Sequence, residues 1–366
     1  MSMIVPGIFI LYYLLLLFLL LGWRSGQLCG TPPAIRISVV IPVRNEEQSI
    51  TPLLDDLAGQ TFPPHEVIVV DDHSTDGTLA VINARMQGNQ TFPLKVIRLS
   101  EGASGKKKAI TTAVDFAQGD IIATTDGDCR VGTEWIHSIA GCFTSEGMKL
   151  VAGAVRLKAD TFFGEMQQLE QAALTGITAT FITFRMPVMC NGANLAYRKS
   201  LFNEVNGYGG NEHMASGDDE FLLKKVAGRY PGGVFFNPDS RSIVTTPQAK
   251  SVSEFVNQRV RWAGKWRQAG FGASAFLAMF VFIFHLTYLL IPLWAMGWVL
   301  SLSTLSLLVL IKLLLEFILL MRINRWMNVP FNIHAFVALQ FFYSPYVVFF
   351  GLISNLLRAT WKGRKI

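Results

Sequence analysis

The sequence lacks charged side chains in three long stretches. No Asp, Glu, Lys or Arg occurs in residues 1–23, 268–311 or 326–357. About 20 uncharged, mostly apolar residues are enough to cross a bilayer as a helix. The first run lacks the basic leader and the clean cleavage site of a signal peptide, and its apolar core is too long for one. These gaps predict a membrane-anchored chain, with residues 1–23 as an N-terminal transmembrane anchor.

Cysteines are few, and they show no metal-type spacing. The chain has 4, at positions 29, 129, 142 and 190. Paired spacings such as C-x-x-C, which zinc sites use, are absent, and nothing suggests a disulfide framework. We therefore expect neither structural zinc nor disulfides, and scattered free thiols fit a reducing cytosol.

Acidic residues are missing from the end of the chain. No Asp or Glu follows Glu316, while six basic residues do: Arg322, Arg325, Arg358, Lys362, Arg364 and Lys365. Basic residues that flank apolar spans favour the cytoplasmic side of a membrane. Attraction to anionic lipid head groups accounts for the net charge of +6. No nucleic-acid partner is needed to explain this charge.

The middle of the chain has the pattern of an α/β domain, which we place at residues 24–250. Short runs rich in β-branched residues, such as "ISVVIPV" and "EVIVVDD", alternate with helical stretches. Such alternation predicts parallel βαβ units, in which ligands bind outside the carboxyl ends of the strands. Asp71–Asp72 and Asp126–Asp128 each directly follow a strand, so we expect them to share one edge of the sheet.

The C-terminal third has three predicted parts. Residues 251–271 mix Phe255, Trp262 and Trp266 with Arg and Lys, which favours an amphipathic interfacial helix; a basic helix packed on the flank of the domain is the alternative. Residues 272–357 are expected to form transmembrane segments, with two helices near 272–295 and 300–321. Residues 358–366 form a basic tail.

The last apolar run, 326–357, leaves two alternatives open. It is long for one helix and is interrupted by Ser344-Pro345. It therefore predicts either a third span or a re-entrant hairpin at Pro345. Within the preceding helix, Lys312 and Glu316 lie four residues apart on one face and are expected to pair. Upstream, residues 160–190 are apolar enough to lie on a membrane surface or pack beneath it.

Five motifs occur in order between residues 35 and 267: "VVIPVRNEE", "VIVVDDHSTDGT", "TTDGDCR", "SGDDEFL" and "QRVRW". Together they resemble the membrane-bound family 2 glycosyltransferases, the branch with cellulose, chitin and hyaluronan synthases and ceramide glucosyltransferases. The resemblance implies an α/β fold of GT-A type, a Rossmann-like mixed sheet flanked by helices, with N- and C-terminal transmembrane helices. It also implies that residues 24–250 are a cytoplasmic catalytic domain.

The resemblance assigns the donor and metal sites. A sugar diphosphate gains negative charge as it leaves, and Mg²⁺ or Mn²⁺ held by hard oxygen ligands would neutralise that charge. By similarity, Asp128 contacts the metal and Asp126 contacts the metal shell or the ribose; an ordinary Asp-Gly turn is the alternative. The remaining donor residues implied are Pro42, Arg44, Glu46, Asp71, Asp72 and Lys106, with Lys106 meeting the diphosphate. A UDP-sugar is the favoured donor.

The catalytic base and the acceptor site are implied in the same way. The acceptor hydroxyl must lose a proton as it attacks, and one carboxylate opposite the leaving group is the simplest base. Asp219 falls on the base position, and Asp218 would hold or tune it; an acidic helix N-terminus is the alternative. The implied acceptor or diphosphate residues are Gln258, Arg261, Trp262, Asn191, Gly192 and Asn194.

The resulting hypothesis is an inverting, metal-dependent glycosyltransferase at the cytoplasmic membrane face. It would move a sugar from a nucleotide-diphosphate sugar to a lipid or glycan. A processive polysaccharide synthase is the alternative. Such an enzyme needs a polar path through the membrane, and the few polar residues in the C-terminal spans therefore favour a glycolipid product. A non-catalytic nucleotide-binding membrane scaffold is a third class, but it predicts damaged acids, whereas Asp72, Asp126, Asp128 and Asp219 are present. No G-x-G-x-x-G follows the first strand, which disfavours a nicotinamide enzyme.

Overall fold

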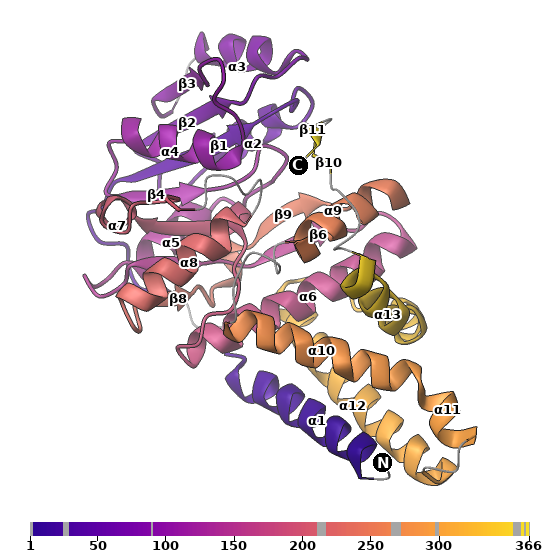
Figure 1. Ribbon diagram of the computed structural model, residues 1–366. Helices are drawn as coiled ribbons and strands as arrows, with labels where there is room; N and C mark the ends of the chain where they lie inside the picture. The colour runs from indigo at the N-terminus through magenta and orange to yellow at the C-terminus, as the bar shows by residue number, and fades with distance from the viewer. Residues whose placement is uncertain are drawn as a thin grey trace. The chain divides into compact units, whose positions relative to one another are not determined.

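The computed structural model describes residues 3–24, 29–88, 91–210, 217–264, 272–296, 300–353, 360–361 and 364–365. The chain divides into two compact units (Figure 1). We call Arg24–Lys158 with Phe181–Pro247 the sheet unit, and Met1–Trp23 with Ala159–Thr180 and Gln248–Ile366 the helical unit. The expected domain 24–250 thus differs in two segments, because residues 159–180 and 248–250 group with the apolar helices.

The sheet unit is built on a mixed sheet, as the family resemblance implies. This sheet has seven strands within the described residues. Its strands, in spatial order, are β3 (Leu94–Arg98), β2 (Glu66–Asp71), β1 (Ile37–Val43), β4 (Ile121–Thr124), β7 (Leu195–Arg198), β5 (Leu150–Ala152) and β8 (Val234–Phe236). The first four strands are parallel, and β7 runs antiparallel to β4. A second, two-stranded sheet pairs β6 (Val155–Lys158) with β9 (Val244–Pro247).

The strand order creates a switch point between β1 and β4. The chain builds outward from β1 to β2 and β3, then crosses to the other side of β1 to form β4. In such sheets the crevice at the switch point, outside the carboxyl ends, is where ligands bind. β4 pairs only with residues 37–40 of β1, so Pro42, which has no N–H to donate, lies beyond the last pair on that side. Pro42 thus ends the ladder beside this crevice.

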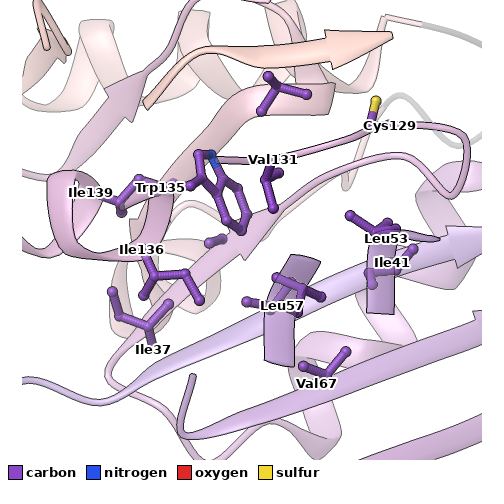
Figure 2. Close-up of a cluster of buried hydrophobic side chains, with 14 of the residues drawn as sticks. Ile37, Ile41, Leu53, Leu57, Val67, Cys129, Val131, Trp135, Ile136 and Ile139 are labelled. Carbon is purple, nitrogen blue, oxygen red and sulfur yellow. The ribbon is translucent and has the colours of Figure 1, made fainter. Parts of the chain in front are cut away.

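Helices cover both faces of the sheet: α2 (Ile50–Ala58), α3 (Thr78–Met86), α4 (Lys106–Phe116) and α5 (Trp135–Cys142). Side chains alternate between the faces of a strand. Odd-numbered residues of β1, such as Ile37 and Ile41, pack with Leu53 and Leu57 of α2 and with Trp135 of α5 (Figure 2). Helix α4 packs on β1 and β2. The core thus holds the carboxyl ends of β1, β2 and β4 in a rigid frame.

The helical unit contains three helices long and apolar enough to cross a membrane, among the described residues. They are α1 (Ile4–Gly22), α12 (Leu302–Trp326) and α13 (Ile333–Ile353); the shorter α10 (Ala273–Leu289) and α11 (Ile291–Met296) precede α12. Helices α1, α10 and α12 lie side by side (Figure 1). Part of α6 (Phe162–Thr183) and all of α9 (Val252–Gly264) belong to the same unit.

Two expectations about the C-terminal helices have clear outcomes. Lys312 Nζ lies 2.9 Å from Glu316, which confirms that pair, and Tyr12 of α1 donates to the same carboxylate at 2.8 Å. Helix α13 continues through Pro345, so the chain does not turn back there as a hairpin would. Ser344 is held by His285 of α10 at 2.9 Å, so a neighbouring helix supports α13 next to its proline.

The remaining boundaries differ by a few residues or lie outside the described part. The helix expected near 272–295 is divided at Leu290 into α10 and α11, and the one expected near 300–321 extends to Trp326. Residues 265–271 of the expected interfacial helix, with Trp266, lie outside the described residues. So does most of the basic tail, of which Thr360–Trp361 pairs with Arg364–Lys365.

Candidate active site

The ends of β1 and β2 bring the first predicted donor residues together. Arg44 Nη1 donates to the carbonyl oxygen of Asp72 at 2.6 Å. Asp72 is only 2% exposed, and its carboxylate accepts from the backbone N–H of Gly105 at 3.0 Å. Asp71 is fully buried and accepts from the N–H of Ser74 at 3.1 Å, so it closes the turn after β2. Asp72 therefore ties the end of β2 to the start of α4.

The Asp126–Asp128 turn follows β4 and packs against the β1 loop. The N–H of Cys129 donates to the carbonyl of Asp126 at 3.1 Å, which closes the turn. A Cβ on Gly127 would lie 2.9 Å from Val43 and 3.0 Å from Glu46. Glycine is therefore needed here for close approach to the β1 segment. As expected, the acidic turns after β2 and β4 lie at one edge of the sheet, on either side of β1.

Lys106, the first residue of α4, reaches the Asp126 turn. Its Nζ lies 2.5 Å from Asp126 Oδ1. Burial lowers the pKa of Lys106, but Asp126, Asp218 and Asp219 raise it more, so its pKa lies well above the usual value. The ammonium therefore stays charged at neutral pH. It forms a fixed cation between two acidic segments that are far apart in the chain.

The second acidic segment begins α8 (Asp218–Arg229), after Gly217 in the left-handed region. Asp219 Oδ2 accepts from the N–H of Gly192 at 3.1 Å. A Cβ on Gly192 would lie 3.3 Å from Asp218 and 3.5 Å from Lys106 Nζ. Asp218 is buried, whereas Asp219 is partly exposed. Gly192 thus allows both carboxylates to approach Lys106, and Asp219 is the one more open to solvent.

Two residues at this edge were not predicted from the sequence. Thr124, the last residue of β4, donates its hydroxyl to the carbonyl of Gly192 at 2.7 Å and so joins the two acidic segments through the backbone. Gly105, at a φ of 95°, supplies the N–H that Asp72 accepts. Neither has a local signal, because each acts on a partner more than 30 residues away.

The predicted acceptor residues near 191–194 divide into two kinds. Asn191 caps the short helix η1 (Gly192–Asn194) by accepting from Ala193 N–H at 3.0 Å. Asn194 is buried, and its side-chain amide bonds Trp135, Ala154 and Ser242 at 2.8–3.1 Å. We therefore remove Asn194 from the acceptor set, since this amide fastens η1 to the core.

The other predicted acceptor residues belong to the helical unit. Gln258, Arg261 and Trp262 lie on α9, spaced so that Gln258 and Trp262 are four residues apart on one face. The contact of this motif with the acceptor stays a prediction.

The carboxylate ligands at the Asp126–Asp128 turn fit a hard divalent cation. Among the described residues, no three His, Cys, Asp or Glu gather as metal ligands. Mg²⁺ commonly takes only one or two carboxylates from a protein and completes its shell with water and substrate phosphates. Asp126 and Asp128 are both partly exposed and supply carboxylate oxygens of this kind. These two residues would hold the metal together with a diphosphate.

Comparison with known proteins agrees with this architecture. Residues 38–205 match the family model described as glycosyl transferase family 2. β-Monoglucosyldiacylglycerol synthase of Synechocystis sp. is 29% identical over 246 residues, which cover 64% of this chain and 48% of that protein. Glycosyltransferase AglE of Haloferax volcanii is 27% identical over 201 residues, covering 52% and 60%. The chain therefore spans about half the length of the curated relatives it matches.

A solved structure resembles the chain over nearly its whole length. The mannosyltransferase PcManGT from Pyrobaculum calidifontis, in complex with GDP-Man and Mn²⁺, has a TM-score of 0.63 at 18% identity. The match covers 97% of this chain and 98% of that one. At this identity the likeness concerns the fold. The chain thus contains a glycosyl transferase family 2 domain, over residues 38–205, on a sheet of GT-A type.

Proposed function

We propose that the protein is a membrane-bound, inverting glycosyltransferase that moves a sugar from a nucleotide-diphosphate sugar to a lipid or glycan. The carrying observation is the cluster of Lys106, Asp126, Asp218 and Asp219 beside the switch point of the sheet. A cation between two acidic segments suits a reaction in which the diphosphate of the donor gains negative charge while the hydroxyl of the acceptor loses a proton. The basic flanks of the apolar helices support a cytoplasmic face.

The leaving diphosphate is assigned to Lys106 and the Asp126–Asp128 turn. Lys106 is a permanent cation, so it can attract the diphosphate in the ground state and stabilise it more as its charge grows. A bound Mg²⁺ or Mn²⁺ would add neutralisation of the phosphate oxygens. PcManGT was solved with Mn²⁺, and the two carboxylates here have the chemistry to hold the same ion.

The base is assigned to Asp219. Its Oδ2 is held by the Gly192 N–H at 3.1 Å, and the side chain is partly exposed, so it has a fixed orientation and access to an incoming hydroxyl. Asp218, buried beside it, tunes the local charge. We assign no second carboxylate as a nucleophile, and a single displacement then inverts the anomeric centre.

The donor nucleotide is assigned to the β1 and β2 ends. Arg44, which bonds the Asp72 carbonyl, would border the nucleotide together with Pro42 and Glu46. We propose that Asp72 binds the uracil or ribose of a UDP-sugar. Asp71 supports the turn after β2 by accepting from the N–H of Ser74.

The acceptor is proposed to be a membrane lipid. In the sheet unit, Asn191 and Gly192 would border it next to Asp219. In the helical unit, Gln258, Arg261 and Trp262 are the residues that the family resemblance assigns to the acceptor. The support is the three apolar helices and the relative named for a glucosyldiacylglycerol.

A donor screen tests this proposal. Membranes that contain the full chain would be incubated with radiolabelled UDP- and GDP-sugars with Mn²⁺, and lipid and polymer products would be separated. We expect label in a single glycolipid from a UDP-sugar. Long labelled glycans would show that the protein is a processive synthase and not a glycolipid synthase. No transfer from any donor would contradict the proposal.

Lys106→Met should weaken donor use. The change keeps the length of the side chain but removes the cation beside Asp126, so the diphosphate loses its fixed positive partner. We expect kcat/KM for the donor to fall about 10²-fold, the usual size for one such contact. Lys108→Met, two residues along the same helix at an exposed site, is the matched control and should change it less than twofold. Equal effects of the two variants would contradict the assignment.

A further inference from the structure

Helix α9 carries a buried ion pair at a position that the motif does not specify. Arg259, the residue after Gln258, is 4% exposed. Its guanidinium bonds Glu170 of α6, and Tyr346 of α13 donates its hydroxyl to the same carboxylate at 2.7 Å. Burial lowers the pKa of Arg259 and Glu170 raises it, with a net increase, so the guanidinium stays charged. The carboxylate of Glu170 therefore joins α9 and α13 to α6 within the helical unit.

The same guanidinium touches two residues of the Q-x-x-R-W motif. Arg259 Nη1 donates to Gln258 Oε1 at 3.1 Å. Its carbon Cζ lies 4.3 Å from the centre of the Trp262 ring and 4.6 Å from that of Phe255. Residues three and four apart share a helix face, so the cation lies between these two rings. The guanidinium is held by Glu170 through Nη2 and by Gln258 of the motif through Nη1.

A buried ion pair contributes little net stability, because desolvation of both charges offsets their attraction. A contact that only joins helices could equally be made by apolar side chains of similar size. Arginine offers something those cannot: a flat, rigid cation that stacks on an aromatic ring and donates sideways at the same time. Its contacts here use both properties.

We propose that Arg259, fixed by Glu170 and Tyr346, is a positioning residue that sets the orientation of Gln258 and Trp262 for the acceptor. This inference rests on the proposed function, in which these two side chains border the acceptor. Arg259 itself touches no reacting atom. It acts through the amide of Gln258 and the indole of Trp262.

The sharpest test separates stability from transfer. Arg259→Met leaves the carboxylate of Glu170 buried without its cation, with only Tyr346 still donating to it, and should lower the melting temperature. Arg259→Met with Glu170→Met removes both charges and should restore it. We expect both variants to lose acceptor kcat/KM about 10²-fold, the size of a 1 Å misplacement. Glu254→Gln, an exposed change on the same helix, is the control and should leave both quantities unchanged. Recovery of transfer together with stability in the double variant would overturn the proposal.

Two further measurements complete the experiment. If Arg259 acts through Trp262, then Arg259→Met combined with Trp262→Ala should lower acceptor kcat/KM no more than the worse single change; multiplied effects would contradict it. Hydrolysis of the donor by water should stay within about twofold of the wild-type rate, because the donor site is untouched. A parallel loss of hydrolysis would also overturn the proposal.

Failure of the proposed function gives a different result. Wild-type protein would then neither transfer nor hydrolyse any donor. The positioning of Trp262 is still measured in that case, by near-ultraviolet circular dichroism of Arg259→Met in the presence and absence of Trp262→Phe. We expect a spectral change that depends on Trp262, and no such change would contradict the inference without reference to activity.

Discussion

Asp219→Asn should lower sugar transfer about 10³-fold while the protein stays folded. Loss of a general base commonly costs 10²- to 10⁴-fold. Asparagine has nearly the same shape, and its amide oxygen can still accept from the Gly192 N–H that now holds Asp219 Oδ2 at 3.1 Å. The change removes the ability to take a proton, together with one negative charge near Lys106 and the oxygen that accepts from the N–H of Glu220. The measurement is kcat with the donor identified in the screen, together with the melting temperature.

Glu220→Gln is the matched control for that experiment. It removes one negative charge from the next residue of the same helix end, so a general electrostatic effect of the cluster would appear there as well. We expect less than a threefold change. Transfer undiminished in Asp219→Asn would contradict the base assignment. Equal losses in both variants would mean that the acidic helix end acts only through its charge.

Removal of divalent metal should abolish transfer, with an expected loss of about 10³-fold. A metal at a leaving diphosphate contributes several kcal/mol to the transition state, and about 4 kcal/mol corresponds to this factor. Exhaustive chelation followed by titration with Mn²⁺ or Mg²⁺ should restore the rate. In Asp128→Asn the metal concentration for half-maximal rate should rise at least tenfold, because one of two carboxylate ligands is replaced by a weaker amide oxygen.

Two observations would contradict the metal assignment. Full activity after exhaustive chelation would mean that Lys106 alone carries the diphosphate charge. An unchanged metal requirement in both Asp126→Asn and Asp128→Asn would mean that other residues hold the metal. The melting temperature without metal serves as the control, since we expect the core of the sheet unit to keep the fold intact.

Much of the architecture follows from local patterns in the sequence. Alternating apolar runs predicted the parallel strands, and because each acidic motif directly follows a strand, their common edge could be expected as well. Charge-free runs predicted the long helices. The four-residue spacing of Lys312 and Glu316 predicted their contact, since that spacing alone brings side chains together on a helix. The family resemblance supplied the roles of the motif residues, which no spacing could have supplied.

The tertiary structure decided which residues meet across long distances. Asn194 matched an acceptor motif, but its partners Trp135, Ala154 and Ser242 come from other segments and occupy its amide. Lys106 sits between Asp126 and the Asp218–Asp219 pair only because β4 ends and α8 begins at the same edge.

Arg259 shows the same division most clearly. Its spacing from Phe255 and Trp262 is visible in the sequence. Glu165 and Glu170, the two acids in the otherwise uncharged segment 162–183, are a weak signal for a buried partner. The pairing with Glu170, 89 residues away, depends on how α6, α9 and α13 pack. The sequence by itself determined the helices, the strands and the groups that can carry charge, because these depend on near neighbours. Packing decided which charges face one another, because contacts between distant segments produce no periodic pattern in the local sequence.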